Sequence, residues 1–425
     1  MKLVRTIGRC ARQSAEILAA LEQRGGAALD SVLPAVKRIV SDVRKRGDRA
    51  LLRCAAQFDG LQDAADLRVT QQEMAAAYEE IDPALRKALS TAAKQIRVFA
   101  KRQLPASWDA SPVTGLTTGQ LLRPLGSVGC YVPSGRHPLP STLLMTAIPA
   151  QVAGVKRIVV VSPKPAPETL AAAHLLGITE FYRLGGAHAI AALAYGTASL
   201  QRVDKIVGPG SLYVTAAKRL VAFDCAIDML AGPTEIVVTS ENGNAADIAS
   251  DLVAQAEHDP EALAIFITTR PDLAKEVIAE AKLRSRNNPI ARRALDRNGL
   301  VILASTVDEA RKITNRLAAE HLTVDASIDL DWVQNAGSVF VGRWSAQPMG
   351  DYISGPNHTL PTGGMARVRG GLSVNDFVKL ITVQEYTAEA LRSLGPPAIL
   401  LAEAEGLVGH AESIRARLQK RRPRV

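Results

Sequence analysis

The apolar and polar positions of the chain follow two different rhythms in succession. Up to about residue 125 the apolar residues recur every three or four positions, which is typical of amphipathic helices. This spacing predicts helices over residues 13–23, 29–44, 70–81 and 83–102. From Gly126 onward, short aliphatic runs alternate with helical stretches, and the run at 157–161, RIVVV, is apolar throughout and mostly β-branched. That alternation predicts parallel sheets built from strand-helix-strand units.

The strands expected from this alternation fall into two groups along the chain. They cover residues 127–132, 157–161, 180–184, 205–207, 235–239, 264–269, 300–304 and 338–341. After Gly371 the spacing predicts helices again, at 374–381, 387–392 and 397–417. This last stretch of about 50 residues is too short for a core of its own, so we expect an arm that docks on another surface.

Together these patterns predict an α/β fold with two parallel-sheet, Rossmann-like domains, an N-terminal helical segment and a C-terminal helical arm. We expect the helical segment at residues 1–23. The first α/β domain is expected at 24–125 plus 236–371, with the N-terminal helices packed on the later sheet. The second α/β domain is expected at 126–235 and the arm at 372–425.

Composition and charge narrow the class of protein. The 425 residues are 47% hydrophobic, 4% aromatic and 22% charged, as in an ordinary globular protein rich in small aliphatic side chains. Part of the net charge of +9 comes from residues 415–425, RARLQKRRPRV, which contain no acid. Because no aromatic residue is interleaved there, a solvated terminus is favoured over a nucleic-acid surface. A basic surface also suits acidic metabolites or cofactors.

Cysteine spacing indicates the cellular compartment of the protein, and hydropathy indicates whether the chain crosses a membrane. The four cysteines form no CxxC pair, so neither a thiolate zinc cluster nor a disulfide framework is indicated, and a reducing cytoplasm fits. The N-terminus lacks the apolar core of a signal peptide. The longest weakly charged stretch, 138–155, is interrupted by Pro140, Pro149 and Gly154, so we expect no membrane span.

The stretch at 350–364, GDYISGPNHTLPTGG, concentrates candidate chemistry. Its glycines and prolines predict a loop, and the loop carries an acid, Asp351, and an imidazole, His358. Loops of this kind serve binding or catalytic sites more often than packing, although a tight surface connection is the alternative. The arm adds another acid and imidazole, Glu405 and His410.

Two pairs of residues elsewhere have the spacing of functional groups. Gln255 and His258 lie three residues apart in a predicted helix, so they project from one side and can supply two ligands to a metal. A hydrogen-bonded helix end would look the same. Glu320 and His321 are adjacent where a predicted helix gives way to an extended run. They provide the two groups most used for proton transfer near neutral pH, with a solvated helix end as the alternative.

Three glycine-containing turns follow predicted strands. Two of them, LGGAH at 184–188 and VGPGSLY at 207–213, open helices and thereby suit phosphate, although neither matches G-x-G-x-x-G. The third, GCYVPSGR at 129–136, offers Tyr131 for stacking and Arg136 for phosphate. All three are expected at the carboxyl ends of strands, where open α/β sheets bind ligands.

Over its whole length the chain resembles the histidinol dehydrogenase family, zinc enzymes of the last two steps of histidine biosynthesis. The resemblance rests on motifs that occur in the same order: GCYVPSGR, GGAHAIAALAYGT, RVDKIVGPGSLYVTAAKRLV, IDMLAGPTE, DLVAQAEHDP, AAEHLTVDA, GDYISGPNHTLPTGG and AEGLVGH.

The resemblance implies a role for each candidate residue. Glu320 and His321 would be the catalytic acid-base pair. One zinc ion per subunit would be bound by Gln255, His258, Asp351 and His410. Substrate would contact these six residues and also Thr234, His358 and Glu405. Cofactor would contact Tyr131, His188 and Ser211. The family pattern has Gln, Asn and Ser where this chain has His188, Ser211 and Thr234, and the first two departures bear on cofactor contacts.

The implied activity is a four-electron oxidation of L-histidinol to L-histidine by two NAD, in a cytoplasmic homodimer whose C-terminal arm supplies Glu405 and His410 to the partner's site. The first α/β domain would hold the metal and catalytic residues and the second would bind the nucleotide. Family paralogues oxidise other small alcohols such as sulfonated diols, which is the alternative activity. Glu405 argues against it, because a carboxylate repels an anionic substrate. A non-catalytic nucleic-acid-binding protein is the alternative from another class; we expect no nucleic-acid and no membrane partner.

Overall fold

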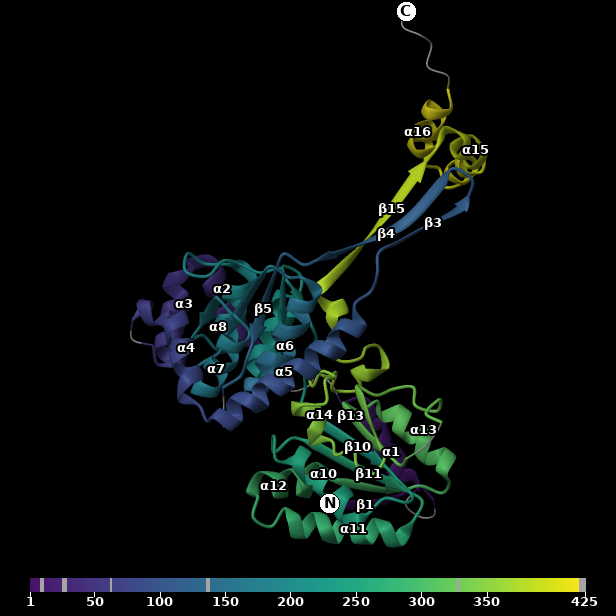
Figure 1. Ribbon diagram of the computed structural model, residues 1–425. Coiled ribbons are helices and arrows are strands. Elements are labelled where there is room, and N and C mark those ends of the chain that lie inside the picture. The colour runs from purple at the N-terminus through teal and green to yellow at the C-terminus, as the bar shows by residue number, and fades with distance from the viewer. Residues whose placement is uncertain (8–10, 25–28, 62, 135–137, 327–328, 420–425) are drawn as a thin grey trace, which may run out of the picture. The chain divides into compact units, whose positions relative to one another are not determined.

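The computed structural model describes residues 1–7, 11–24, 29–61, 63–134, 138–326 and 329–419 (Figure 1). The chain divides into two compact units. The first comprises Met1–Gln103 and Leu125–Phe377, and the second comprises Leu104–Pro124 and Val378–Val425. The first unit contains two six-stranded sheets covered by helices, which confirms the α/β prediction.

One sheet of the first unit has the strand order β1-β12-β11-β10-β13-β14, and all its pairings are parallel. Its strands are β1 (Lys2–Arg5), β10 (Glu235–Thr239), β11 (Leu263–Thr268), β12 (Leu300–Leu303), β13 (His321–Val324) and β14 (Ser338–Val341). Helices α10 (Ala245–Ala256), α11 (Pro271–Arg284) and α12 (Pro289–Asn298) cover one face, while α1 (Ala11–Glu22) and α13 (Val307–Leu317) cover the other.

The sequence of β10 explains why this sheet is covered on both faces. Ile236 and Val238 belong to the core beneath α10 to α12, whereas Val237 belongs to the core beneath α1 and α13. Successive side chains of a strand point to opposite faces, so a strand buried on both sides is apolar at every position.

The other sheet has the order β2-β7-β6-β5-β8-β9, with only β2 antiparallel to its neighbour. Its strands are β2 (Arg68–Val69), β5 (Ser127–Tyr131), β6 (Arg157–Val161), β7 (Glu180–Tyr182), β8 (Lys205–Val207) and β9 (Ala226–Ile227). From β5 the chain proceeds to β6 and β7 on one side and then returns to β8 and β9 on the other. The strand order therefore reverses between β5 and β8, which is where open α/β sheets bind ligands.

The N-terminal helices cover this second sheet and not the sheet of residues 235–341, which corrects the packing expected for residues 24–125. The helices are α2 (Leu29–Arg46), α3 (Asp48–Cys54), α4 (Gln71–Glu80) and α5 (Pro83–Gln103). The apolar stripe of α2, including Val36 and Val43, is buried in one core with Ile190 and Val214. Those residues belong to α8 (Gly186–Tyr195) and α9 (Leu212–Val221), while α4 packs on α7 (Pro167–Leu175) and α5 on α6 (Pro140–Ala153). An amphipathic stripe shows that a face is buried but not which sheet it covers.

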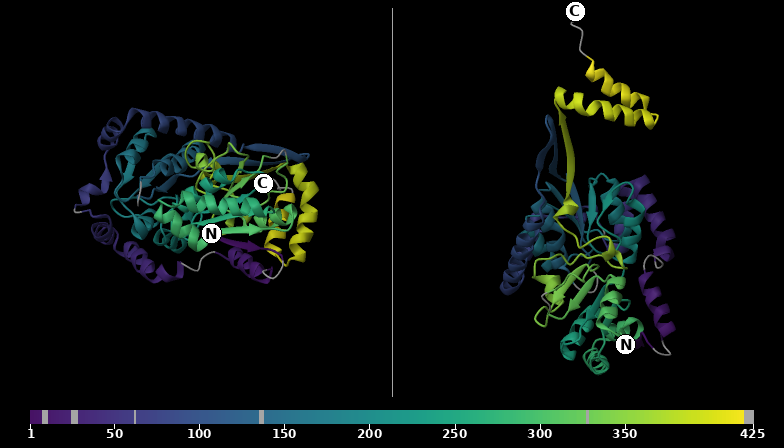
Figure 2. Two further views of the ribbon diagram at one scale, coloured as in Figure 1. Left: turned by 90° about the horizontal axis from the view of Figure 1, so that it is seen from below. Right: turned by 90° about the vertical axis from the view of Figure 1, so that its right-hand side faces the viewer.

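The second unit contains a three-stranded antiparallel sheet and two helices. The strand order is β15-β4-β3, from β3 (Trp108–Val113), β4 (Leu116–Pro124) and β15 (Val378–Tyr386). Helices α15 (Ala388–Ala404) and α16 (Val408–Leu418) pack against each other (Figure 2). The helix expected at 374–381 is wrong from Val378 onward. The β-branched run Ile381-Thr382-Val383 instead pairs with β4.

No described helix combines the length and apolarity needed to cross a bilayer.

Candidate active site

Glu320 and His321 lie where an interior strand begins, beside the edge strand β14 of its sheet. Helix α13 ends at Leu317, and β13 begins at His321 between β10 and β14, with His321 opposite Ile236 and Ser338. Glu320 and His321 are only 7% and 3% exposed. A solvated helix end is therefore excluded for this pair.

A chain of hydrogen bonds holds the Glu320 carboxylate. Its Oε2 accepts from the Thr234 hydroxyl at 2.6 Å and from the Glu235 backbone N–H at 2.8 Å. The Thr234 oxygen in turn accepts from Nε2 of Gln255. Burial raises the pKa of Glu320 to about 7, although these donors and His321 lower it. The carboxyl can therefore exchange a proton near neutral pH.

Neighbouring acceptors assign the tautomer of His321. Its Nδ1 lies 3.1 Å from the Glu235 carbonyl oxygen and 3.6 Å from Oε2 of Glu320. The Glu235 carbonyl oxygen can only accept and lies closer to Nδ1 than the donating Nε2 of Gln255 does, at 3.4 Å, so a proton on Nδ1 is favoured. Nε2 lies toward Asp351, 3.5 Å from Oδ1. Burial lowers the pKa of His321, but the negative charges of Glu320 and Asp351 outweigh burial, and the net pKa lies above its ordinary value.

Part of the stretch expected as a loop is a short helix, α14 (Pro348–Tyr352), which carries Asp351. A Cβ on Gly350 would lie 2.6 Å from the Phe340 ring, so close packing requires glycine there. Oδ2 of Asp351 accepts from Nε2 of Gln347 at 3.0 Å. Burial raises the pKa of Asp351, whereas the neighbouring His321 ring and the charge of His358 lower it, with a net lowering.

His358 lies on the same side of the site. Its Nδ1 donates to the Asp351 carbonyl oxygen at 2.8 Å, and its Nε2 lies 3.4 Å from the Thr142 hydroxyl on α6. Burial lowers the pKa of His358, and the net shift is also downward. A neutral imidazole with one assigned N–H is therefore expected near neutral pH.

His321, Asp351 and His358 line one pocket of about 390 Å³. Its walls combine titratable groups with apolar and aromatic side chains. They include His321, Asp351, His358, Asn357, Phe340, Trp344, Met349 and Leu360. The structure thus brings together residues that the sequence singled out in two separate motifs.

The side chains predicted to hold a metal offer suitable donors. Oε1 of Gln255 is buried and has no hydrogen-bond partner in the described part of the chain, while Nε2 of the same residue lies 3.4 Å from His321. His258 is exposed just beyond α10, close enough to His358 to lower the pKa of that ring. An amide oxygen, an imidazole and a carboxylate form a nitrogen and oxygen donor set that fits zinc. Over the described residues, no cluster of three or more His, Cys, Asp or Glu side chains is arranged to hold a metal.

Glu405 and His410 belong to the second unit. Glu405 is the C-cap of α15, and His410 lies in the first turn of α16; both are exposed.

The first glycine turn expected to bind phosphate is already occupied by protein side chains. The Gly185 N–H donates to Oδ2 of Asp59 at 3.2 Å, and the Gly186 N–H donates to the Tyr131 hydroxyl at 3.1 Å. The same Asp59 oxygen lies 2.7 Å from Nε2 of His188. This arrangement corrects the interpretation of that turn as an open phosphate cradle. Burial raises the pKa of Tyr131 to about 12, so its hydroxyl stays protonated.

The second glycine turn fits a cofactor better. Ser211 is the exposed N-cap of α9, and within the described residues its side chain makes no capping hydrogen bond. The turn follows β8, at the reversal of strand order, where a helix N-terminus favours phosphate.

Arg136 lies outside the described residues. Sequence reasoning missed Asp59 and Gln347, which are linked to the site only through folding.

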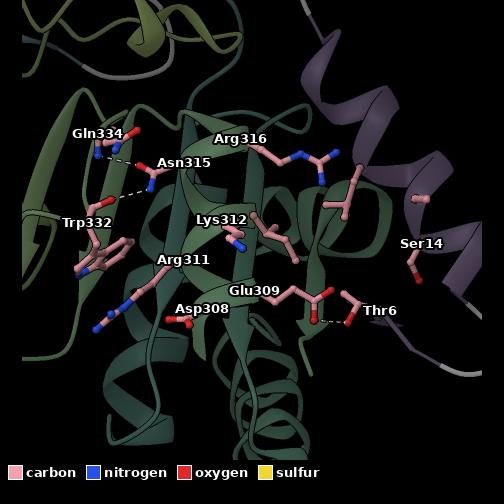
Figure 3. Close-up of a pocket in the computed structure, with 13 residues that line it drawn as sticks. Thr6, Ser14, Asp308, Glu309, Arg311, Lys312, Asn315, Arg316, Trp332 and Gln334 are labelled. Atoms are coloured by element: carbon pink, nitrogen blue, oxygen red, sulfur yellow. Dashed lines mark hydrogen bonds between the residues drawn. The ribbon is translucent and has the colours of Figure 1, made fainter. Parts of the chain in front are cut away.

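A second hollow in the first unit has a different character (Figure 3). It lies beside α1 and α13, and some of its polar groups bind one another. The Thr6 hydroxyl donates to Glu309 at 2.8 Å, and Asn315 donates to the Trp332 carbonyl oxygen at 2.7 Å. The described residues that line it include none of those predicted for catalysis, metal or cofactor.

Comparison with known proteins shows which family this chain is similar to in sequence and in fold. The family model described as histidinol dehydrogenase matches residues 22–418. The histidinol dehydrogenase of Methanothermobacter thermautotrophicus is 44% identical over 413 residues, which cover 94% of this chain and 96% of the relative. That of Geobacillus kaustophilus is 46% identical over 398 residues, covering 91% and 94%. The crystal structure of histidinol dehydrogenase from Elizabethkingia anophelis superposes with a TM-score of 0.91 at 33% identity and covers 98% of both chains.

Proposed function

Because the chain belongs to the histidinol dehydrogenase family, we propose that it oxidises L-histidinol to L-histidine through L-histidinaldehyde, with two NAD and one zinc ion per subunit. The observation that carries this proposal is the buried pair Glu320 and His321 beside the pocket that Asp351 and His358 line. This pair supplies two proton-transfer groups with different surroundings. The reaction needs two proton transfers, one from the alcohol and one from the water that hydrates the aldehyde. The buried free cysteines Cys54, Cys130 and Cys225 agree with a cytoplasmic enzyme.

In the first oxidation His321 acts as the base. Its Nδ1 lies 3.1 Å from the Glu235 carbonyl oxygen, which favours a proton on Nδ1 and leaves Nε2 as the nitrogen that accepts the alcohol proton. The alcohol carbon loses a hydride at the same time, and the product is the aldehyde. NAD, when bound, accepts that hydride and a second one in the later oxidation.

The aldehyde must be hydrated before a second hydride can leave. Glu320 takes a proton from water as water adds to the carbonyl carbon, and the protonated His321 gives its proton to the carbonyl oxygen, so that His321 can accept again in the second oxidation. The two donors on Oε2, from Thr234 and Glu235, keep the carboxylate in one orientation. Loss of a second hydride from the hydrate, with a proton accepted by His321, gives the carboxylate product. Two hydrides account for the four electrons.

Substrate recognition follows from the donors and charges of the site. Zinc held by Gln255, His258, Asp351 and His410 would bind the neutral imidazole and amine of the substrate and orient them. His358 and Thr234 complete the polar wall within the first unit. The negative charges of Asp351, Glu320 and Glu405 attract an amino alcohol that is cationic in solution, before its amine binds as a neutral ligand, and they disfavour a sulfonated diol, the alternative substrate class.

We further propose a homodimer in which each site is completed by the arm of the partner chain. The arm carries Glu405 and His410, and it exposes apolar side chains at Leu400, Leu401 and Val408, which are 68%, 66% and 65% exposed. Such exposure supports burial against another surface. In a symmetric dimer, what one chain supplies to its partner it also receives.

A substrate comparison tests the proposed function. Purified enzyme with zinc and NAD is expected to form two NADH per L-histidinol consumed, as measured by absorbance. Other amino alcohols and sulfonated diols are the comparison substrates. A higher kcat/KM for a sulfonated diol than for L-histidinol would make the sulfonated diol the substrate. Salt-sensitive DNA binding without NAD reduction would overturn both dehydrogenase activities.

Mixed dimers test the shared site. When His321→Ala and His410→Ala chains are unfolded together and refolded, random pairing makes about half of the dimers mixed. Each mixed dimer holds one doubly damaged site and one intact site, so about a quarter of wild-type activity should return.

The control pairs His321→Ala with Glu320→Ala, two lesions on the same side of the shared site. That mixture is expected to stay inactive. If the first mixture also stays inactive while mass spectrometry confirms mixed dimers, each site is built from one chain.

A further inference from the structure

A buried ion pair that the proposed reaction does not use lies beneath the second glycine turn. Lys218 on α9 and Asp228, just after β9, approach to 2.6 Å between Nζ and Oδ1, and their side chains are 4% and 0% exposed. Removing two charges from water is costly, so such a pair calls for an explanation beyond the stability it adds.

Both members of the pair bind one glycine. Nζ of Lys218 donates to the Gly208 carbonyl oxygen at 2.5 Å, and Oδ2 of Asp228 accepts the Gly208 N–H at 2.7 Å. Oδ1 of Asp228 also accepts the Met229 N–H at 2.6 Å. The N–H and the carbonyl oxygen of Gly208 are therefore both fixed, and each buried charge has hydrogen-bond partners.

Backbone geometry ties the same glycine to the end of β5. Gly208 has φ of 111°, a conformation that side chains disfavour, and a Cβ there would collide with the Tyr131 carbonyl oxygen. The pair thus holds the chain against β5 at the reversal of strand order. Three residues later the chain reaches Ser211, the N-cap of α9.

We propose that Lys218 and Asp228 are positioning residues for the dinucleotide. They hold Gly208 so that the turn from Gly208 to Ser211 is already shaped to receive the anionic phosphates of NAD. Both side chains are buried and act through the turn. The pair is neutral overall, so it leaves the positive end of α9 available to an anion. This inference rests on the proposed function, because it takes NAD as the coenzyme.

A neutral double variant separates positioning from stability. Lys218→Met alone leaves Asp228 buried without its cation, so it is expected to lose both stability and NAD affinity. Lys218→Met combined with Asp228→Asn removes both charges at similar volume, and urea unfolding should show part of the stability regained. Calorimetry should nevertheless show the Kd for NAD raised about tenfold, the equivalent of one lost charge-assisted hydrogen bond.

The matched control is the ion pair Arg157 and Glu180, 2.8 Å apart at the amino ends of β6 and β7 in the same sheet. Arg157→Met is expected to lower stability without changing the Kd for NAD. If the double variant binds NAD as tightly as wild type, the positioning role is overturned. If wild-type protein binds no NAD, the proposal that NAD is the coenzyme is wrong, and this inference is wrong with it.

Wild-type protein provides a measurement that needs no variant to fold. Hydrogen exchange should show the Gly208 amide protected before NAD is added and little changed afterwards. Protection that arises only on addition of NAD would mean that the turn is not held in advance, and would overturn the proposal.

Discussion

Glu320→Gln is expected to slow the oxidation of supplied L-histidinaldehyde by about 10²- to 10⁴-fold while slowing the first hydride step far less. The amide keeps the shape of the carboxyl and an oxygen that can accept from Thr234 and Glu235. It cannot take a proton from water, so hydration of the aldehyde would lose its proposed base. His321→Ala removes the base proposed for both oxidations and should slow both.

The two half-reactions are separated by their starting material. Single-turnover NADH formation from L-histidinol reports the first step, and NADH formation from L-histidinaldehyde reports the second. Circular dichroism and zinc content should match wild type in the Glu320→Gln protein. Equal losses in both half-reactions would remove Glu320 from its assigned role.

His258→Ala is expected to abolish tight zinc binding, with metal content falling from about one ion per subunit to near zero and activity falling with it. His258 is one of four proposed ligands, so its loss would leave Gln255, Asp351 and His410 with a single imidazole between them. Elemental analysis after dialysis against a weak chelator measures the loss.

His174→Ala is the matched control for this prediction. His174 is an exposed histidine on α7, packed beside Tyr78 with ring centroids 5.1 Å apart, and we assign it no role in the site. That variant should retain zinc. Full zinc content in the His258→Ala protein would exclude His258 as a ligand.

Local sequence patterns were sufficient to predict many of the strands and the position of the Glu320 and His321 pair. The run RIVVV is strand β6, and the adjacent pair Glu320 and His321 does lie where a helix gives way to a strand. Both predictions depend on neighbours in sequence. A strand buried on two faces must be apolar throughout, and a dipeptide keeps its spacing in any fold.

Predictions failed where distant segments decide the outcome. The stripe on α2 is the same whichever sheet it covers, and the turn at Gly185 and Gly186 looks open until Asp59 is brought to it from 126 positions away. Likewise, Val378 to Ile381 have helical spacing but form a strand because β4 offers them a partner. Tertiary context overrides local preference at each of these positions.

The pairing of β15 with β4 determines when the second unit can fold during synthesis of the chain. β4 ends at Pro124 and β15 begins at Val378, so residues 125–377 must be synthesised before the middle strand of the second unit gains its second neighbour. At ordinary ribosomal speeds this takes roughly 10–50 s, during which one edge of β4 is exposed on the nascent chain. The second unit is therefore the last to fold, and the hairpin of β3 and β4 is the segment that a chaperone would have most reason to cover.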